Sequence, residues 1–244
     1  MTPPSDPRWR WPHAEPGAVT WWRRALQWFG KDLIFRWILL PLTGGCSIYG
    51  AENLPRTGGA VLASNHVSFA DPPWIGACVH RRVYAMAKRE LFEAPIFGWI
   101  IHSVFAFPVD RSIADHVALR HGIDLVSRGE LLLIFPEGGR SPDGEVQKGS
   151  IAPAMVAGRV GVPILPVAIV GTDRVLPRGA KFLHHHRTAI AFGEPMTVTP
   201  DAAGRLTRAV LDAATTDLMD RIRALRAFLL ERLAEEKAPR ARPS

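Results

Sequence analysis

The sequence predicts an α/β protein whose core is a mixed, largely parallel sheet flanked by helices. Three observations lead to this fold class. After residue 45, short apolar runs of strand length alternate with longer stretches of helical periodicity. No segment repeats at a fixed period. The length of 244 residues suits one domain, or one domain with an appendage, and allows a sizeable buried core.

The expected elements follow in order. The apolar runs predict strands at residues 46–49, 60–63, 83–87, 105–109, 131–135, 164–170 and 188–192. Helical stretches are expected near residues 72–80, 90–102, 113–128 and 150–160. A closing helix over 201–238 is predicted because leucine and isoleucine recur there at helical spacing, with charged residues on the other side. The expected units are a tryptophan-rich arm and helix (1–44), an α/β domain (45–200), and a closing helix with a basic tail (201–244).

The first 37 residues hold six of the eight tryptophans. No proline interrupts residues 18–40, so a helix is expected there, with basic residues gathered on one arc. Indole rings favour the headgroup zone of a membrane, and arginine reaches anionic lipid. An amphipathic helix lying in a membrane interface is therefore predicted, with a helix docked on the rest of the fold as the alternative. The expected membrane contacts are Trp21, Trp22, Trp28, Phe29 and Trp37.

The longest apolar stretch, residues 33–42, is shorter than the ~20 residues that a simple spanning helix needs. The N-terminus also lacks the pattern of a cleaved signal peptide. We therefore expect a peripheral or monotopic protein on the cytoplasmic face of the cell membrane.

The charge and the cysteines exclude several classes of protein. The formal charge is +7, but no block of lysine and arginine indicates a nucleic-acid-binding tail. The excess of positive charge still implies an anionic partner, which could be nucleic acid, anionic lipid or a phosphorylated substrate, and composition does not choose among these. A nucleic-acid binder is the least expected, because the sequence has no recognisable module for it. Cys46 and Cys78 form no C-x-x-C motif, which argues against a disulfide framework or a zinc site. The run 184–186 of three histidines is interpreted as a polar turn before a strand, so no metal is expected.

The first candidate constellation follows the apolar strand ending near residue 63. His66 is poised to act as a general base near neutral pH. Asp71, five residues later, could accept the other ring N–H and stabilise the imidazolium, while Asn65 could orient the turn. This spacing also arises by chance, so it carries weight only together with other features.

The second constellation follows the apolar run 131–135, where Pro136 leads into a glycine-rich turn. Gly138 and Gly139 permit positive φ and close approach of a ligand to the main chain. Arg140 offers a fork of donors for a phosphate, although a solvated arginine would look the same in sequence. Lys88 and Arg111 also follow apolar runs. Three cations at strand ends predict a pocket for a phosphorylated substrate.

These residues resemble the glycerolipid acyltransferase family, and most closely its 1-acylglycerol-3-phosphate acyltransferases. The family's N-H-x-x-x-x-D block is matched at 65–71, and its aromatic residue followed by arginine at 107–111. Its F-P-E-G-T-R-S block is matched at 135–141, and its V-P-hydrophobic-x-P-V block at 162–167. Order and spacing hold over about residues 50–170, with one departure: Gly139 replaces the usual threonine.

The resemblance implies transfer of a fatty acyl group from an acyl thioester to the free hydroxyl of lysophosphatidic acid, which makes phosphatidic acid in phospholipid biosynthesis. The donor would be acyl-CoA or acyl-carrier protein, acting as co-substrate, and no cofactor or metal is expected. His66, oriented by Asp71, would deprotonate the hydroxyl, and Glu137 would orient the arginine side chains. The expected phosphate-binding residues are Lys88, Arg111, Glu137, Gly138 and Arg140.

Two alternatives remain open at this point. The same chemistry could act on glycerol 3-phosphate or on another lysolipid. A peripheral protein that binds anionic lipid without catalysis is the alternative from another class, and it would leave the histidine–aspartate pair without a task.

Overall fold

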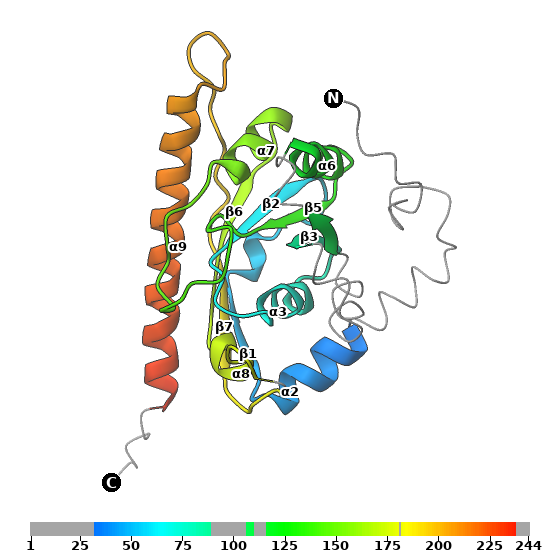
Figure 1. The fold of residues 1–244 in the computed structure, drawn as a ribbon, viewed down its shortest axis with the longest axis vertical. Coiled ribbons are helices and arrows are strands. Elements are labelled where there is room, and N and C mark those ends of the chain that lie inside the picture. The colour runs from blue at the N-terminus through cyan, green and yellow to red at the C-terminus, as the bar shows by residue number, and fades with distance from the viewer. Residues whose placement is uncertain (1–31, 89–105, 110–115, 181, 238–244) are drawn as a thin grey trace, which may run out of the picture.

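The computed structural model describes residues 32–88, 106–109, 116–180 and 182–237, in which helices cover both faces of a seven-stranded sheet (Figure 1). The order of the strands is β1-β7-β6-β2-β5-β3-β4. The strands are β1 (Cys46–Tyr49), β2 (Ala60–Ser64), β3 (Val83–Lys88), β4 (Ala106–Val109), β5 (Leu131–Ile134), β6 (Ile164–Val170) and β7 (Thr188–Phe192).

Five neighbouring strands, β6, β2, β5, β3 and β4, run parallel to one another. Strand β7 is antiparallel to β6, and β1 is parallel to β7. The predicted mixed, largely parallel sheet is therefore confirmed. Because the parallel strands share one direction, the loops that follow β2, β5 and β6 leave the same edge of the sheet, where α/β proteins place their sites.

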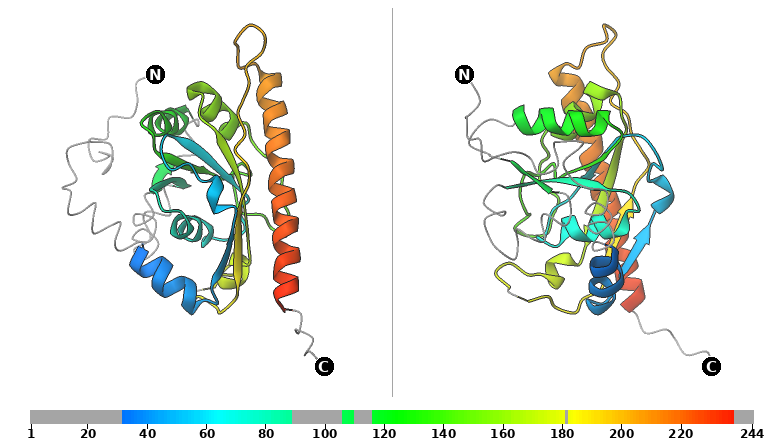
Figure 2. Two further views of the ribbon diagram at one scale, coloured as in Figure 1. Left: turned by 180° about the vertical axis from the view of Figure 1, so that it is seen from behind. Right: turned by 90° about the vertical axis from the view of Figure 1, so that its right-hand side faces the viewer.

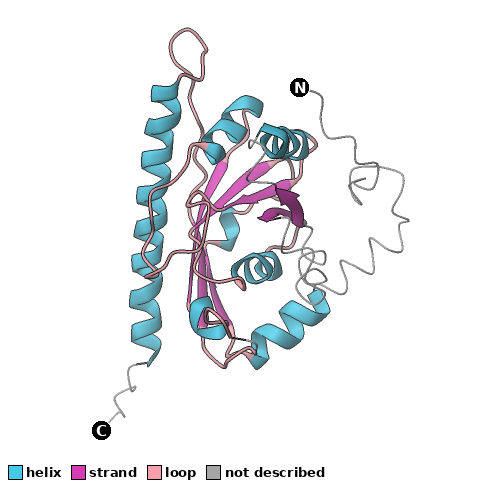
Figure 3. Cartoon of the chain, in the orientation of Figure 1, coloured by secondary structure: helices cyan, strands magenta, loops and turns pink. Residues whose placement is uncertain are grey.

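The helical segments that cover the sheet are η1 (Asp32–Leu39), α2 (Leu40–Leu42), η2 (Ala51–Asn53), α3 (Asp71–Cys78), α6 (His116–Ser127), α7 (Ala152–Val160), α8 (Thr172–Val175) and α9 (Arg208–Lys237). Helix α9 runs along one face of the sheet and α3 lies on the other, as Figures 1 and 3 show and the rear view in Figure 2 repeats.

The side chains of β2 explain how one strand supports both layers. Ala60 and Leu62 pack in the cluster that contains α3, while Val61 and Ala63 pack in the cluster that contains α7 and α9. All four are fully buried. Successive residues of a strand point to opposite faces, so a strand covered on both sides is apolar throughout.

Two predicted boundaries need correction. The closing helix begins at Arg208 rather than at residue 201. Asp201 Oδ1 accepts hydrogen bonds from the N–H groups of Ala203 and Arg205, and Gly204 has a φ of +73°, so this stretch forms a turn. The helix expected near 150–160 begins at residue 152, with Pro153 in its first turn, where a missing N–H costs nothing. The helix expected at 90–102 lies outside the described residues.

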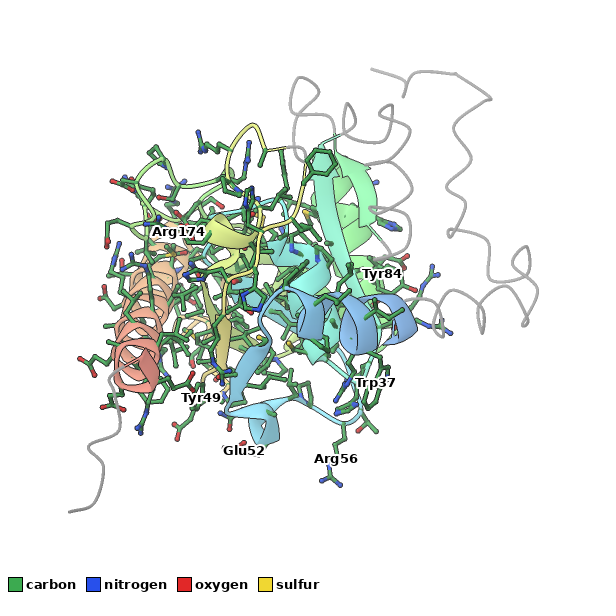
Figure 4. All side chains as sticks on the ribbon, turned by 90° about the horizontal axis from the view of Figure 1, so that it is seen from below. Trp37, Tyr49, Glu52, Arg56, Tyr84 and Arg174 are labelled. Carbon is green, nitrogen blue, oxygen red and sulfur yellow. The ribbon has the colours of Figure 1, made fainter. Side chains whose placement is uncertain are left out.

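The described part of the N-terminal segment packs against the fold on one side. Leu40 is buried, and Arg36 Nη1 lies 3.5 Å from the carbonyl oxygen of Ala77 at the end of α3. Trp37 instead is 69% exposed and lies at the edge of the molecule in Figure 4. The other expected membrane contacts, Trp21, Trp22, Trp28 and Phe29, lie outside the described residues. None of the helices in the described part of the chain is long and apolar enough to cross a bilayer.

The histidine run 184–186 lies in the loop before β7. Its main chain is fixed by bonds from His184 N–H to the carbonyl of Val175 and from His186 N–H to the carbonyl of Thr43. Among the described residues, no group of three or more histidine, cysteine and acidic side chains is arranged to hold a metal ion. Cys46 and Cys78 form no disulfide with each other, and their sulfur atoms lie 3.9 Å apart.

Candidate active site

The loop after β2 brings His66 against Asp71. His66 Nδ1 lies 2.8 Å from Asp71 Oδ2, and the side chains are 13% and 0% exposed. Because a buried carboxylate accepts at Nδ1, the ring carries its proton there and presents Nε2 as the basic nitrogen. The histidine–aspartate arrangement expected from the five-residue spacing is thus the one that the loop forms.

Asp71 is held by more than the histidine. Its Oδ2 also accepts the N–H groups of Val67 (2.7 Å) and Ser68 (2.9 Å), so the carboxylate closes the loop that carries His66. Its Oδ1 accepts the hydroxyl of Thr172 in α8. Asp71 is also the first residue of α3, where the helix dipole favours a negative charge. These partners satisfy both oxygens of a fully buried carboxylate and hold it in one position.

Asn65 fixes the other end of the same loop. Its side-chain nitrogen donates to the carbonyl of Ile169 (3.0 Å), and its side-chain oxygen accepts the N–H of Ile169 (2.8 Å). The side chain thereby pairs with β6 just beyond the end of β2. Because both ends of this buried amide are hydrogen-bonded, the main chain is fixed at Asn65, and this fixes the position of the next residue, His66.

The strand end at Phe135 forms the wall beside His66. The two rings stack with centroids 4.0 Å apart and an interplanar angle of 21°. The N–H of Ser141 also donates to the carbonyl of His66, at 2.7 Å. The two sequence blocks therefore meet, as strand-end reasoning predicts, and the histidine ring is held in one plane.

Glu137 links two segments of main chain at the site. Its Oε1 accepts the N–H of His66 (2.9 Å), and its Oε2 accepts the N–H of Gln147 (3.0 Å). Within the described part of the chain neither oxygen binds an arginine. Arg111 lies outside that part, so the expected role of Glu137 in orienting arginine side chains stays a prediction. The two bonds shown tie the main chain of His66 to the loop 141–150. Burial raises the pKa of Glu137, while the two main-chain bonds act in the opposite direction.

This geometry makes Glu137→Gln more disruptive than its near-identical shape suggests. An amide has one acceptor atom, so its NH₂ group would face the N–H of either His66 or Gln147. Leaving one such group unpaired costs about 1–3 kcal/mol. We expect kcat/KM to fall about 10- to 100-fold in E137Q, with a small decrease in the melting temperature. The exposed Glu52→Gln is the control, and equal activity of E137Q and E52Q would contradict this role.

The glycine turn presents Arg140 beside the histidine loop. The guanidinium Cζ lies 3.6 Å from the centroid of the Phe69 ring. Gly138 has a φ of +68°, as expected, whereas Gly139 does not use a positive φ. Open space surrounds the position where a side chain at Gly139 would begin. The turn therefore leaves room for the threonine that is usual in the resembled family.

Two of the expected phosphate ligands, Lys88 and Arg111, lie partly or wholly outside the described residues. Lys88 is the last residue of β3, so its main chain lies at the same edge of the sheet as the site. Its side chain and all of Arg111 lie outside what the structure describes. Of the expected residues, the structure brings together Asn65, His66, Asp71, Glu137, Gly138, Gly139 and Arg140.

Two residues missed by sequence reasoning complete the site. Thr172 supplies the hydroxyl on Asp71 Oδ1, and Arg178 donates to the carbonyls of Arg140 and Ser141. A signal for Thr172 was available: it follows the end of β6, the strand next to β2. Arg178 lies in a turn after α8 and had no comparable signal.

Comparisons with known proteins show the family of this chain. A model of the family described as Acyltransferase matches residues 46–170. The chain is 30% identical over 190 residues to a 1-acyl-sn-glycerol-3-phosphate acyltransferase of Bacillus subtilis, covering 77% of this chain and 92% of that protein. It is 28% identical to the Streptococcus pneumoniae protein of the same name, over 66% of this chain and 60% of that protein.

A solved structure is similar as well. The crystal structure of the 1-acyl-sn-glycerophosphate (LPA) acyltransferase PlsC from Thermotoga maritima aligns with a TM-score of 0.60 and 27% identity. The alignment covers 89% of this chain and 80% of that chain. His66, Asp71, Glu137 and Arg140 fall inside the range matched by the family model, whereas Arg178 lies beyond it.

Proposed function

Since the chain belongs to the acyltransferase family, we propose that it transfers a fatty acyl group from an acyl thioester to the free hydroxyl of lysophosphatidic acid. The product is phosphatidic acid. The observation that carries the proposal is the 2.8 Å contact between His66 Nδ1 and the fully buried Asp71, beside a turn that presents Arg140. The names of the Bacillus subtilis and Thermotoga maritima proteins support the acceptor.

The proposed chemistry is direct transfer with a general base. His66 Nε2 takes the proton of the acceptor hydroxyl while that oxygen attacks the thioester carbonyl. Asp71 stabilises the imidazolium that forms. The carbon–sulfur bond then breaks, and the imidazolium gives its proton to the departing thiolate. A thiol with a pKa of about 8.5 is a good leaving group, so no covalent acyl-enzyme is required.

Arg140 is proposed to hold the phosphate of the acceptor and so to place the hydroxyl near His66. Arg140 is half-buried, and its guanidinium lies over the Phe69 ring. An arginine fork binds a phosphate through two parallel hydrogen bonds. Fixing the phosphate converts attack by a free molecule into attack by a positioned one, which lowers the barrier to reaction. Lys88 and Arg111 are proposed as further phosphate ligands.

A single assay tests the proposed reaction. The purified protein is incubated with lysophosphatidic acid and a panel of acyl-CoA and acyl-carrier-protein donors, and thiol release and product mass are measured. Release of one thiol for each phosphatidic acid formed is expected. Glycerol 3-phosphate and a phosphate-free lysolipid serve as competing acceptors. Preference for either one would replace lysophosphatidic acid as the substrate, and vesicle binding without thiol release would leave the non-catalytic alternative.

We further propose that the segment 18–41 holds the enzyme at the surface of a phospholipid membrane on its cytoplasmic face. The acceptor is an amphiphile and the product stays in the bilayer, so the reaction requires access to lipid. Trp37, at 69% exposed, supports this proposal. Indole rings at headgroup depth and nearby arginine favour such a surface.

Membrane binding can be tested by substitution. Deletion through residue 41 would also remove Leu40, which is buried in the core. We instead expect combined serine substitutions at Trp21, Trp22, Trp28 and Trp37 to reduce binding to anionic vesicles at least about tenfold, since each ring contributes buried apolar area. Vesicle sedimentation measures the change. Phe182→Ser removes another exposed ring, and equal losses in both proteins would contradict a specific role for this segment.

A further inference from the structure

The segment 172–178, which follows β6, contacts both the loop that carries His66 and the turn that carries Arg140. Thr172 donates to Asp71 Oδ1, and the carbonyl of Leu176 accepts the hydroxyl of Ser68 at 2.9 Å. Arg178 Nη2 donates to the carbonyls of Arg140 (2.8 Å) and Ser141 (3.2 Å). This segment lies outside the range 46–170 matched by the family model. Its contacts therefore add to the site described by the sequence blocks.

Arg140 holds a set of donors that the described residues leave unused. Its guanidinium packs on Phe69, but no described residue accepts a hydrogen bond from its side chain or pairs with it as a carboxylate. A half-buried guanidinium normally finds acceptors, because its five N–H donors are costly to leave unpaired. A guanidinium placed in this way is suited to binding an anion.

Arg178 adds a second positive charge at the same place. Both of its hydrogen bonds to described residues use Nη2, so Nη1 and Nε have no acceptor within the described ranges. Burial lowers the pKa of Arg140, and the nearby charge of Arg178 lowers it further. Two guanidinium groups in this arrangement repel each other until an anion lies between them.

Three described carboxylates near the site do not supply that anion. Asp71 binds His66 and Thr172, and Glu137 binds two main-chain N–H groups. Asp143 accepts the hydroxyl of Ser141 and the side-chain N–H of Gln147. Each of these carboxylates accepts hydrogen bonds from other groups, and none of them pairs with Arg140 or Arg178. The two arginines can therefore bind an anionic ligand.

We propose that Arg178 is a second phosphate ligand, which binds the phosphate of the acceptor together with Arg140. This inference rests on the proposed acyl transfer to lysophosphatidic acid. One guanidinium group then serves two purposes: Nη2 fixes the carbonyls of the turn that carries Arg140, and the remaining donors face the anion. A phosphate dianion has enough oxygen acceptors for both arginines.

The test separates the charge of Arg178 from its hold on the turn. Steady-state kinetics are measured with lysophosphatidic acid and one acyl donor for the wild type, R178A, R178K and R140A. We expect R178A and R140A to raise the acceptor KM about 10- to 100-fold, the range for loss of charge-assisted hydrogen bonds, with the donor KM unchanged. R178K keeps the charge without the planar fork, so its acceptor KM should lie between the values for the wild type and R178A.

Arg174→Ala is the matched control. Arg174 lies in α8, four residues before Arg178, and it is an exposed arginine paired with Asp173 (Figure 4). R174A should retain the wild-type acceptor KM. Similar losses in R174A and R178A would show a general surface-charge effect and would overturn the proposal.

Three further outcomes would also overturn it. An unchanged acceptor KM in R178A places the phosphate elsewhere. A fall in kcat alone, equal in R178A and R178K, assigns Arg178 only to holding the turn. An increase in the donor KM alone in R178A would show that Arg178 binds the acyl donor rather than the acceptor. Absence of transfer by the wild type with any donor contradicts the proposed function itself, so the two failures are distinguishable.

Discussion

Replacing His66 with alanine is expected to abolish measurable acyl transfer while leaving the protein folded. A positioned general base contributes about 10²- to 10⁴-fold to rate, and the same imidazole also protonates the departing thiolate. The fold should persist because Asp71 keeps the N–H groups of Val67 and Ser68 and the hydroxyl of Thr172 as partners. The buried carboxylate is therefore not left unpaired.

Thiol release measured at saturating donor and acceptor tests this result, and the melting temperature checks the fold. His184→Ala is the matched control, because His184 is an exposed histidine in the loop before β7. H184A should have wild-type activity. Substantial turnover by folded H66A would remove His66 from the chemistry and would contradict the assignment of the active site.

The strands were predictable because the sheet is covered on both faces. In β2, β5 and β6 every residue is buried, so each strand appears in sequence as a short apolar run. The order of the strands was not predictable from such runs. Nothing in the segment 188–192 indicates that β7 runs antiparallel to β6 and separates it from β1. That arrangement depends on the path of the whole chain.

The active site, like the fold, was predictable from the sequence only in part. The contact between His66 and Asp71 is local, so a spacing of five residues was enough to predict it. Bringing Arg140 to the same place required only that neighbouring parallel strands end at one edge. The main-chain partners of Glu137 were missed because every residue except proline carries a backbone N–H. The identity of the partner residue therefore does not indicate the bond. The position of Arg178 depends on a turn whose path no motif describes.

The N-terminal segment shows why a pattern can fit two environments. Arg36 and Leu40 contact the fold, as the docked-helix alternative requires. Trp37, one residue after Arg36, is exposed, as the membrane-interface prediction requires. A helical segment with one apolar side packed on the core and another facing outward satisfies both patterns. Sequence periodicity alone therefore does not choose between them, and vesicle binding does.

Asp71→Asn is expected to lower kcat about 10²- to 10⁴-fold without unfolding the protein. Oδ2 accepts three N–H donors, from His66, Val67 and Ser68, so the amide must place its oxygen there. Its NH₂ group then faces Thr172, whose hydroxyl can rotate and accept a hydrogen bond. The loop and the histidine tautomer are kept, and only the negative charge is lost. The imidazolium formed during transfer is then no longer stabilised.

A comparison with Thr172→Val isolates that charge. T172V removes the hydroxyl bond to Oδ1 but leaves the carboxyl group of Asp71 beside His66. Loss of one hydrogen bond to a charged group costs about 1.5–3 kcal/mol, shared between stability and activity. We therefore expect T172V to lose at most about tenfold in kcat, and to melt at a lower temperature. If D71N falls no further than T172V, the carboxylate acts only by holding the loop, since both variants disturb the same hydrogen-bond network and D71N alone removes the charge.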